Sequence, residues 1–451
     1  MKQNDEVTDV ELKQGFSAGG GVVHVVGGGT MAHVRPHLAI SAPAYGWTAR
    51  KLVELARAKW DEEDVSVELH LTRMACGEQS APETNEDVRK LLRKIVHRAS
   101  SKVLFMPVAL CDFDAAVMDG AIASQSGKNM PRLKTRDGDQ MMHMTPADKL
   151  IGDIRKYRKD LFLVGFKTTT SATPEEQYLA GLELLKKNSC NLVLANDLHT
   201  KLNMVITPEQ ARYHETKNRS EALSGLVEMA YLRSKNRFTR STVVTGEAVP
   251  WQSPLVPDSL RTVVGHCIAR GAYKPFLGAT VGHFAVKLGG GKFLTSRRKV
   301  DFNRLDEFGL VLVEAKGADS VVAHGHKPSV GGQSQRIVFV DHPDTDCIVH
   351  FHCPLKPGSR VPVRSQREYE CGSHECGKNT SGGLERFGNL YAVHLDQHGP
   401  NIVFSKDADP REVIRFIEEN FDLEAATDGA LRPVHTSTNP DGRREEARQS
   451  L

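Results

Sequence analysis

The chain has few cysteines and no long apolar run. Eight cysteines among 451 residues are too sparse for a disulfide scaffold and suit a reducing compartment. No stretch of about 18 apolar residues occurs, which argues against a membrane-spanning helix. The first residues also lack a positive segment followed by an apolar core, which is the pattern of a secretion signal. We therefore expect a cytoplasmic protein with no membrane partner.

The chain also lacks an excess of charge of either sign. The 59 Lys and Arg residues nearly balance the 56 Asp and Glu residues, and the formal net charge is +3. This balance gives no sign of nucleic-acid binding. The basic stretches 233–240 and 297–299 are interpreted as an interdomain segment and a solvated helix end. The length predicts two or three globular domains.

Composition divides the chain into segments. Residues 1–20 are polar and Gly-rich, and residues 425–451 are rich in polar and charged residues, so both ends are expected to be disordered. Residues 241–257 pass from a short β-branched run into a Pro-containing stretch and are predicted to be a linker. We therefore predict one domain over residues 21–240 and another over residues 258–424.

Apolar strands alternate with helices in the first predicted domain. The predicted elements are strands at 22–26, 102–110, 161–166 and 191–197, and helices at 84–96 and 173–187. This alternation predicts a Rossmann-like, doubly wound α/β domain. Its ligand is expected at the carboxyl ends of the strands.

The first predicted strand runs directly into a glycine turn, residues 27–30. Small residues there let backbone N–H groups and a helix N-terminus face a phosphate. Gly28, Gly29 and Thr30 are therefore candidate nucleotide-binding residues, and Arg35 adds positive charge nearby. The G-x-G-x-x-G spacing is absent, so the turn gives little support for a nicotinamide cofactor.

Several short motifs of this domain match a known family in order. They are Thr30 with 33–35, the strand end 108–114, the basic segment 132–134, Val-Gly-Phe at 164–166, and Ala195-Asn196-Asp197. Over about residues 20–235 the chain thus resembles phosphopantothenoylcysteine synthetase, of the DNA/pantothenate metabolism flavoprotein C-terminal family. That ligase activates a carboxylate with a nucleoside triphosphate and couples it to cysteine.

The resemblance implies a ligase site that uses CTP or ATP with magnesium. The implied nucleotide-binding residues are Gly28, Gly29, Thr30, Arg35, Asp112, Ala195, Asn196 and Asp197. Lys134 would neutralise an acyl-nucleotide intermediate, unless it is only a solvated loop lysine, and Asn196 can alternatively cap a strand-end turn. His33 stands where the family has Asp, and the segments 42–47 and 167–170 also differ. These changes indicate an acid other than phosphopantothenate.

The second domain contains two histidines on one predicted strand, in the run 347–354. Because strand side chains alternate between faces, His350 and His352 project to the same side, about 7 Å apart. His398 precedes another apolar segment that can pair in the same sheet. Three neutral imidazoles with an open position are typical of a catalytic divalent-metal site. The alternative is a pair of ordinary strand histidines.

A series of motifs over residues 255–422 resembles the class II aldolase/adducin family. The matching segments are 260–271, 282–287, 293–298, 327–329, His350 with His352, and His398. The resemblance implies an α/β/α layered domain with a mostly antiparallel sheet. It also implies a divalent metal on the three histidines, with zinc ahead of manganese or cobalt. The implied substrate-binding residues are Gly282, His283, Ser296, Arg297 and Ser329.

The family's metal-adjacent glutamate is absent, because residues 329–332 contain no carboxylate. Losing such a base removes a factor of about 10²–10⁴, which argues against ordinary retro-aldol activity. Glu375 can supply acid/base chemistry instead. Its neighbours Cys371, His374 and Cys376 either bind a soft metal or form a glycine-bounded loop with reduced thiols. His283 and Arg297, in place of Asn and Gly, suggest an anion of different shape.

These patterns predict a bifunctional enzyme, a nucleotide-dependent acid–amine ligase fused to a metal-dependent, aldolase-like lyase that acts on a carbonyl compound. The alternatives are an adducin-like, non-catalytic binding or assembly protein and an epimerase- or decarboxylase-like second domain. Members of the second family build sites between neighbours in a ring, so we also expect a homo-oligomer.

Overall fold

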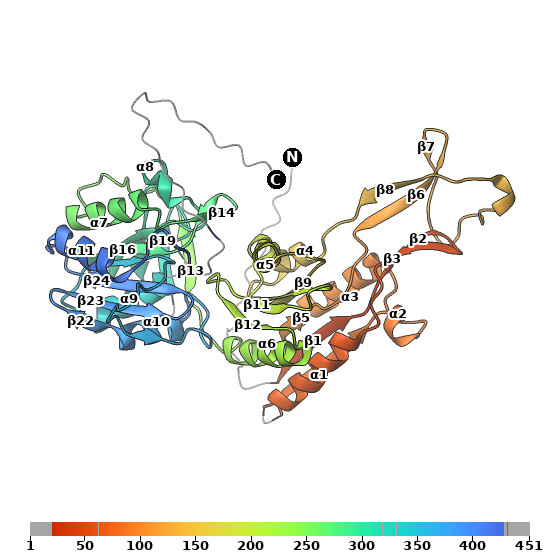
Figure 1. Cartoon of the computed structure of the whole chain (residues 1–451), viewed down its shortest axis with the longest axis horizontal. Coiled ribbons are helices and arrows are strands. Elements are labelled where there is room, and N and C mark those ends of the chain that lie inside the picture. Colours follow the sequence, from red (N-terminus) through yellow and green to blue (C-terminus); the bar gives the residue numbers. More distant parts are fainter. Residues whose placement is uncertain (1–19, 62, 318–319, 330–331, 428–430, 432–451) are drawn as a thin grey trace. The chain divides into compact units, whose positions relative to one another are not determined.

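The computed structural model describes residues 20–61, 63–317, 320–329, 332–427 and 431 (Figure 1). It divides into two compact units, Met1–Arg237 and Phe238–Leu451, called the first and second unit below. Apart from residues 20, 425–427 and 431, the termini expected to be disordered lie outside the described residues. None of the described helices combines the length and hydropathy that crossing a bilayer requires.

The first unit is built on a seven-stranded sheet with the order β12-β11-β10-β9-β5-β1-β4. Its strands are β1 (Gly21–Gly27), β4 (Val65–Leu71), β5 (Ser101–Phe105), β9 (Phe162–Thr169), β10 (Leu192–Asp197), β11 (Asn203–Ile206) and β12 (Arg212–Thr216). The five strands from β4 to β10 are parallel, and β11 and β12 are antiparallel. The predicted doubly wound fold is confirmed, with a switch point between β1 and β5.

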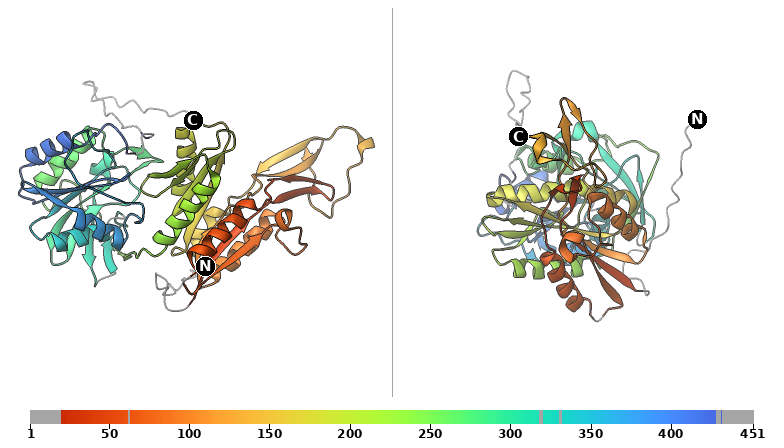
Figure 2. Two further views of the ribbon diagram at one scale, coloured as in Figure 1. Left: turned by 60° about the horizontal axis from the view of Figure 1, so that its bottom comes forward. Right: turned by 90° about the vertical axis from the view of Figure 1, so that its right-hand side faces the viewer.

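Helices cover both faces of this sheet. They are α1 (Trp47–Lys59), α2 (Arg73–Cys76), α3 (Asn85–His97), α4 (Ile151–Tyr157), α5 (Pro174–Asn188) and α6 (Arg219–Arg233). Figures 1 and 2 show α1 and α6 side by side on one face, where Leu52 and Leu226 pack with Val23 in a buried core. On the other face, α3 and α5 each begin with a capping box, at Thr84 and Thr173.

The strand predicted over 102–110 ends at Phe105, because Pro107 has no N–H for a strand ladder. The segments that follow β1 and β5 form an extension, which is made of β2 (Met31–Arg35), β3 (Leu38–Ser41), β6 (Phe113–Asp119), β7 (Ile122–Ala123), η1 (Thr135–Asp137) and β8 (Met142–Pro146). Val34 packs there against Ala115 and Val117. The extension starts where β1 and β5 end, so it borders the switch point.

The second unit is built on a ten-stranded sheet with the order β13-β19-β18-β17-β16-β20-β24-β23-β21, and β22 pairs with β23. The strands are β13 (Arg240–Val244), β16 (His283–Gly289), β17 (Lys292–Ser296), β18 (Leu310–Ala315), β19 (Ser320–His324), β20 (Cys347–His350), β21 (Val363–Arg364), β22 (Glu385–Phe387), β23 (Leu390–Leu395) and β24 (Gly399–Phe404). A separate hairpin is formed by β14 (Pro275–Phe276) and β15 (Ala279–Thr280). The sheet is mostly antiparallel, as predicted.

Two layers of helices sandwich this sheet (Figure 1). They are α7 (Asp258–Ala269), α8 (Leu305–Phe308), α9 (Gly332–Asp341), α10 (His374–Gly383) and α11 (Pro410–Asn420), with a short η2 (Phe302–Arg304). Val263 of α7 and Ile417 of α11 pack on one face, against Phe284 among others. Val338 of α9 packs on the opposite face. The α/β/α layering predicted for this domain is therefore present.

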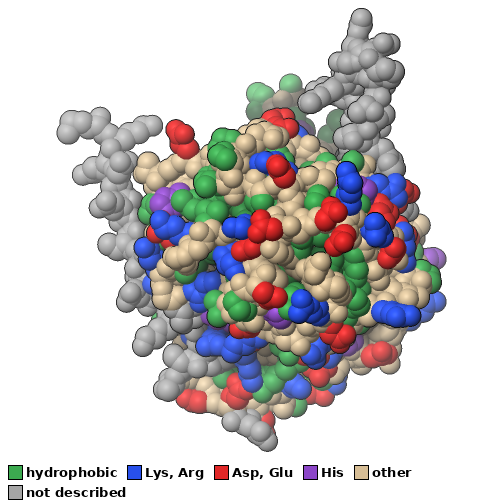
Figure 3. Space-filling view, turned by 90° about the vertical axis from the view of Figure 1, so that its left-hand side faces the viewer, with side chains coloured by type: hydrophobic (Ala, Val, Ile, Leu, Met, Phe, Trp, Pro, Cys, Tyr) green, Lys and Arg blue, Asp and Glu red, His purple; other side chains and the backbone are tan. Residues whose placement is uncertain are grey.

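The predicted linker 241–257 contains most of a strand of the second unit. β13 pairs in parallel with β19 along its whole length, from Arg240↔Ser320 to Val244↔His324. An unpaired strand edge offers a row of backbone donors and acceptors, and the β-branched run Thr242–Val244 supplies a matching strand. The face in Figure 3 shows acidic and basic side chains interspersed, in keeping with the balanced composition.

Candidate functional site

Three buried histidines meet at one end of the second unit's sheet. His350 ends β20, His352 follows it, and His398 precedes β24. The Nε2 atoms of His350 and His398 are 3.2 Å apart, and the three imidazoles offer ligand atoms within 4.8 Å of one another. Their exposed fractions are 1%, 7% and 2%. The three residues predicted as metal ligands are thus brought together.

A backbone carbonyl fixes the orientation of His350. Its Nδ1 lies 2.7 Å from the Pro400 oxygen, which can only accept, so Nδ1 carries the hydrogen and Nε2 presents a lone pair to the cluster. Burial lowers the pKa of His350 to about 4, which keeps the imidazole neutral at pH 7. Tetrahedral zinc with bonds of about 2.0–2.1 Å separates its ligands by about 3.3–3.5 Å, close to the 3.2 Å between His350 and His398. The donor set therefore fits a divalent metal.

Two glycines allow the backbone to pass close to these histidines. Gly282 has φ +106°, and a Cβ there would overlap the carbonyl oxygen of His350. Gly399 has φ +136°, and a Cβ there would overlap the carbonyl oxygen of Phe351. These conformations and close approaches favour glycine. Gly282 was predicted to contact substrate, and the structure also gives it this packing role.

A fourth imidazole, that of His283, lies beside the cluster. His283 pairs with His350 across β16 and β20, and their ring centroids are 4.9 Å apart. The amide nitrogen of Gln335 donates to its Nδ1 over 2.8 Å. Burial, with the neighbouring His350, holds the pKa of His283 well below its usual value. His283 is therefore neutral at pH 7.

The other predicted substrate-binding residues separate into two groups. Ser329 donates its backbone N–H to the Ser296 oxygen over 2.8 Å, and its hydroxyl lies 3.5 Å from the Gly282 oxygen. Arg297 instead directs its guanidinium to the Phe308 oxygen at 2.8 Å and to His326 Nδ1 at 3.1 Å. Ser296, Ser329 and Gly282 therefore lie together, whereas the Arg297 guanidinium is engaged by the end of α8 and by His326.

No carboxylate joins the three histidines within the part of the chain that the structure describes. Glu375 lies in the first turn of α10, where its neighbour His374 contacts the Thr239 hydroxyl at 3.2 Å. Cys371, His374 and Cys376 do not form a ligand group among the described residues. The serine N-cap, Ser373, makes this segment a helix start rather than the loop considered from the sequence.

In the first unit, the glycine turn after β1 meets the end of β5 at the switch point. The Thr30 hydroxyl accepts from the Cys111 N–H over 2.9 Å and donates to Asn85 Oδ1 over 2.7 Å. Gly29 pairs with Ala109. Gly28 has φ +99° and approaches Thr72. Asn85 was missed, because an asparagine in the first turn of a helix is ordinary in sequence.

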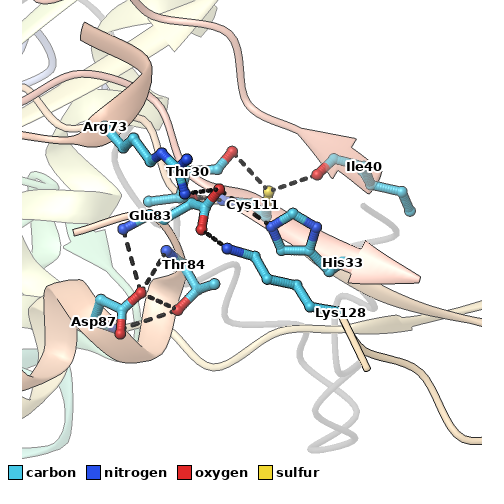
Figure 4. A network of polar contacts seen from close by, with 9 residues as sticks. All are labelled: Thr30, His33, Ile40, Arg73, Glu83, Thr84, Asp87, Cys111 and Lys128. Carbon is cyan, nitrogen blue, oxygen red and sulfur yellow. Dashed lines mark hydrogen bonds and ion pairs between the residues drawn. The ribbon is translucent and has the colours of Figure 1, made fainter. Parts of the chain in front are cut away.

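A network around the partly buried carboxylate of Glu83 borders this turn (Figure 4). Glu83 pairs with Lys128, with Arg73 at 3.3 Å and with His33 at 3.4 Å. Burial alone would raise the pKa of Glu83, but Lys128, Arg73 and His33 lower it overall. His33, which stands where the ligase family has Asp, is thus a partner of Glu83.

Two further predicted nucleotide-binding residues, Arg35 and Asp197, have local structural partners. Arg35 is buried and donates to the Val34 and Gln125 oxygens and to the Ser124 hydroxyl. Asp197 anchors the turn after β10, where its Oδ1 accepts from the N–H groups of 199 and 200 at 2.9 and 2.8 Å. These bonds and its bonds to 169 and 172, acting against burial, lower the pKa of Asp197. The sequence alone does not distinguish an aspartate that anchors a turn from one that contacts a ligand.

Four further predicted residues differ in exposure. Ala195 is fully buried in β10. Asn196 Oδ1 accepts from the Thr168 hydroxyl at 3.3 Å. Asp112 is exposed and pairs with Lys149. Lys134 is exposed at the start of η1. The turn 28–30 and the segment ending at Asp112 converge at the switch point, and Asn196 is the penultimate residue of β10 in the same sheet.

The two halves of the chain are similar to different known proteins. Residues 267–355 match the Class II Aldolase and Adducin N-terminal domain. The chain is also similar to the coenzyme A biosynthesis bifunctional protein CoaBC of Thermococcus kodakarensis, in its first half. That similarity is 29% identity over 87 residues, which is 19% of this chain and 22% of the relative. The match thus spans about a fifth of the curated relative's length.

Two solved structures illustrate the likeness of each half. The DNA/pantothenate metabolism flavoprotein of Streptococcus pneumoniae is 19% identical, with a TM-score of 0.39, over 46% of this chain and 96% of its own. An L-fuculose 1-phosphate aldolase is 18% identical, with a TM-score of 0.28, over 37% of this chain and 82% of its own. The sequence matches liken part of the first half to CoaBC and residues 267–355 to the class II aldolase/adducin domain.

Proposed function

We propose that the chain is a bifunctional enzyme, a nucleotide-dependent acid–amine ligase fused to a metal-dependent lyase that acts on a carbonyl compound. The observation that carries the second activity is the meeting of His350, His352 and His398 in a buried cluster. Protein interiors rarely hold adjacent imidazoles without a ligand or a satisfied hydrogen-bond network, because burying polar groups is costly.

The ligase proposal rests on the first unit. It is supported by the similarity to CoaBC and by a glycine turn at the switch point of a doubly wound sheet, where such folds bind ligands. CTP or ATP with magnesium would be the cosubstrate. Near Thr30, the family's Asp is replaced by His33, which pairs with Glu83. This difference favours an acid other than phosphopantothenate.

In the second unit, His350, His352 and His398 would hold the metal, and His283 and Gln335 would lie beside it. When bound, a divalent metal polarises a carbonyl oxygen as a Lewis acid. Three neutral ligands leave its full positive charge in place, whereas a carboxylate ligand would offset part of it. Proton transfer falls to a group outside the ligand set, since no carboxylate joins it.

A second candidate is an adducin-like binding or assembly protein. It is favoured by one observation, the lack of any carboxylate in the histidine cluster of the described residues. The two candidates differ in what the cluster must do. A lyase requires a bound metal with an accessible position, and a binding protein does not.

The test of the second unit is elemental analysis of untagged protein purified without chelator. We expect the His350→Ala/His352→Ala variant to contain about one divalent metal per chain less than the wild type. His266→Ala is the control, because His266 pairs with Glu418 outside the cluster. Equal metal content in all three proteins after reconstitution with zinc, manganese or cobalt would overturn the metal-dependent lyase and leave the binding protein.

The ligase is tested separately by pyrophosphate release from CTP or ATP in the presence of an acid and an amine. Release above the rate without the acid supports it. Undetectable nucleotide binding by calorimetry would contradict the ligase proposal. It would not bear on the metal proposal, which concerns the second unit.

A further inference from the structure

A second cluster of metal-ligand side chains lies in the first unit, away from the switch-point turn. His24 belongs to β1, and Glu68 and His70 belong to β4, the edge strand of the sheet. The register pairs His24 with Glu68, and Val26 with His70. Paired residues of neighbouring strands and residues two apart share a face. The three side chains therefore converge on one face at the edge of the sheet.

The three facing atoms form a small triangle. His24 Nδ1 lies 3.0 Å from His70 Nε2, and Glu68 Oε2 lies 3.5 Å from the first atom and 3.6 Å from the second. A tetrahedral zinc ion with bonds of about 2.0–2.2 Å separates its ligands by about 3.3–3.5 Å. One cation can therefore lie within bonding distance of all three atoms without rearranging the strands.

The surroundings of His24 hold its Nδ1 ready as a ligand. The Ser101 hydroxyl donates its single hydrogen to the Ile95 oxygen over 2.8 Å, so it accepts from His24 Nε2–H over 2.9 Å. That bond places the hydrogen on Nε2 and leaves a lone pair on Nδ1, facing His70 and Glu68. A hydrogen bond on the far nitrogen is how proteins commonly fix a metal-binding histidine.

Charge and burial also suit a divalent cation. Burial and the neighbouring His70 lower the pKa of His24 to about 4, and burial lowers the pKa of His70. Both rings are therefore neutral at pH 7, the form that binds metal. Arg98 holds Glu68 Oε1 at 2.6 Å and leaves Oε2 turned to the histidines. The positive Arg98 opposes a bound cation, which favours a strongly binding metal such as zinc over magnesium or calcium.

We propose that His24, Glu68 and His70 bind a zinc-type divalent cation. His24 is buried, with 1% of its side chain exposed, whereas Glu68 and His70 are 35% and 22% exposed. The fourth position of the ion opens to solvent at the sheet edge and takes water. Bound metal ties β4 to β1 through side chains in addition to the backbone ladder. It thereby stabilises the first unit by mass action.

The experiment uses the full, untagged chain carrying His350→Ala/His352→Ala, which removes the histidine cluster of the second unit. The protein is equilibrated with zinc, freed of excess by gel filtration, and analysed for metal. We expect about one zinc per chain. Adding His70→Ala should remove it, and adding Glu68→Gln should weaken zinc binding at least about tenfold, since a charged ligand is lost. Titration with Co²⁺ should give the intense visible absorption of a tetrahedral site.

His97→Ala is the matched control, because His97 is an exposed histidine of the first unit bonded to the Arg93 oxygen. It should keep the zinc. His70 is only partly buried, so the unit should stay folded without it, and circular dichroism checks this. Less than about a tenth of an equivalent of zinc in the parent variant would overturn the proposal. So would zinc content that His70→Ala leaves unchanged. Either result would mean that His24 and His70 share only a hydrogen bond.

Discussion

At the scale of single residues, the histidine cluster of the second unit depends on groups that do not bind metal themselves. The Pro400 carbonyl decides which nitrogen of His350 faces the cluster. The Gln335 amide donates to Nδ1 of His283 and so places the hydrogen of that ring on Nε2. Burial keeps both rings neutral. Residue type alone therefore does not define the site, since the hydrogen bond on the far nitrogen sets what each imidazole can do.

The Gly399→Ala substitution tests this packing. Its Cβ would overlap the Phe351 carbonyl oxygen at a backbone φ of +136°, so we expect a loss of about 1–3 kcal/mol in unfolding free energy. Metal affinity should fall too, because Gly399 adjoins His398. Chemical denaturation and metal titration measure both effects.

Gly265→Ala is the control for this change. Gly265 lies in α7, with nothing within 4 Å of the added Cβ, and alanine there should stabilise the helix by about 0.5–1 kcal/mol. A Gly399→Ala protein as stable as the wild type would show that the turn before β24 relaxes freely.

At the scale of elements, the Glu83 network connects segments of the first unit that strand pairing does not connect. Glu83 precedes α3, and its partners His33, Arg73 and Lys128 come from β2, α2 and the extension after β7 (Figure 4). The capping box of Thr84 and Asp87 fixes the adjoining helix start. The network therefore couples the extension to the edge of the switch point.

We expect Glu83→Gln to lower the unfolding free energy by about 1 kcal/mol at pH 7, because a partly buried carboxylate with three basic partners loses its charge. The pKa of Glu83 is lowered in the folded state, below its unfolded value of about 4.3. The carboxylate therefore stabilises the fold above about pH 4.3 and loses this effect as the pH falls. The variant should show a shallower stability loss in acid.

The control for this prediction is Glu86→Gln, a change at a more exposed carboxylate that pairs with Arg89. Exposed pairs contribute little, so its stability should stay within about 0.5 kcal/mol of the wild type. Denaturation curves at several pH values give the comparison. If both variants had the same acid profile as the wild type, the coupling role of Glu83 would be wrong.

At the scale of the whole molecule, the described chain consists of two units with separate cores. One core is formed by residues between Val23 and Ala230, and the main core of the second unit lies between Trp251 and Leu423. Each unit also has its own sheet. A fold divided in this way is expected to unfold in parts.

We expect fragments 20–237 and 238–431 to fold when expressed separately, each with one cooperative thermal transition. The full chain should show two transitions at matching temperatures in calorimetry. Zinc should raise the midpoint of fragment 238–431, because a ligand that binds only the folded state stabilises it. A His350→Ala/His352→Ala fragment is the control and should not respond. A single transition of the full chain, with unfolded fragments, would contradict the division.

The sequence by itself determined the features that depend on local spacing. The i, i+2 spacing predicted that His350 and His352 lie together, although the strand itself ends at His350 and His352 lies just beyond it. Alternating strands and helices predicted the doubly wound fold of the first unit, and the family resemblance predicted the layered fold of the second. The glycine turn after β1 also followed from its residues. Such patterns are visible because helix and strand periods repeat over a few residues.

Only the tertiary structure decided which distant side chains meet. Gln335 reaches His283 from a helix 52 positions away, and His70 reaches His24 across 46 positions. The Arg297 guanidinium donates to the Phe308 carbonyl oxygen. β13 pairs with the edge strand β19, where a linker was predicted. These outcomes depend on long-range packing and on the pairing of buried polar groups, which local periodicity does not encode.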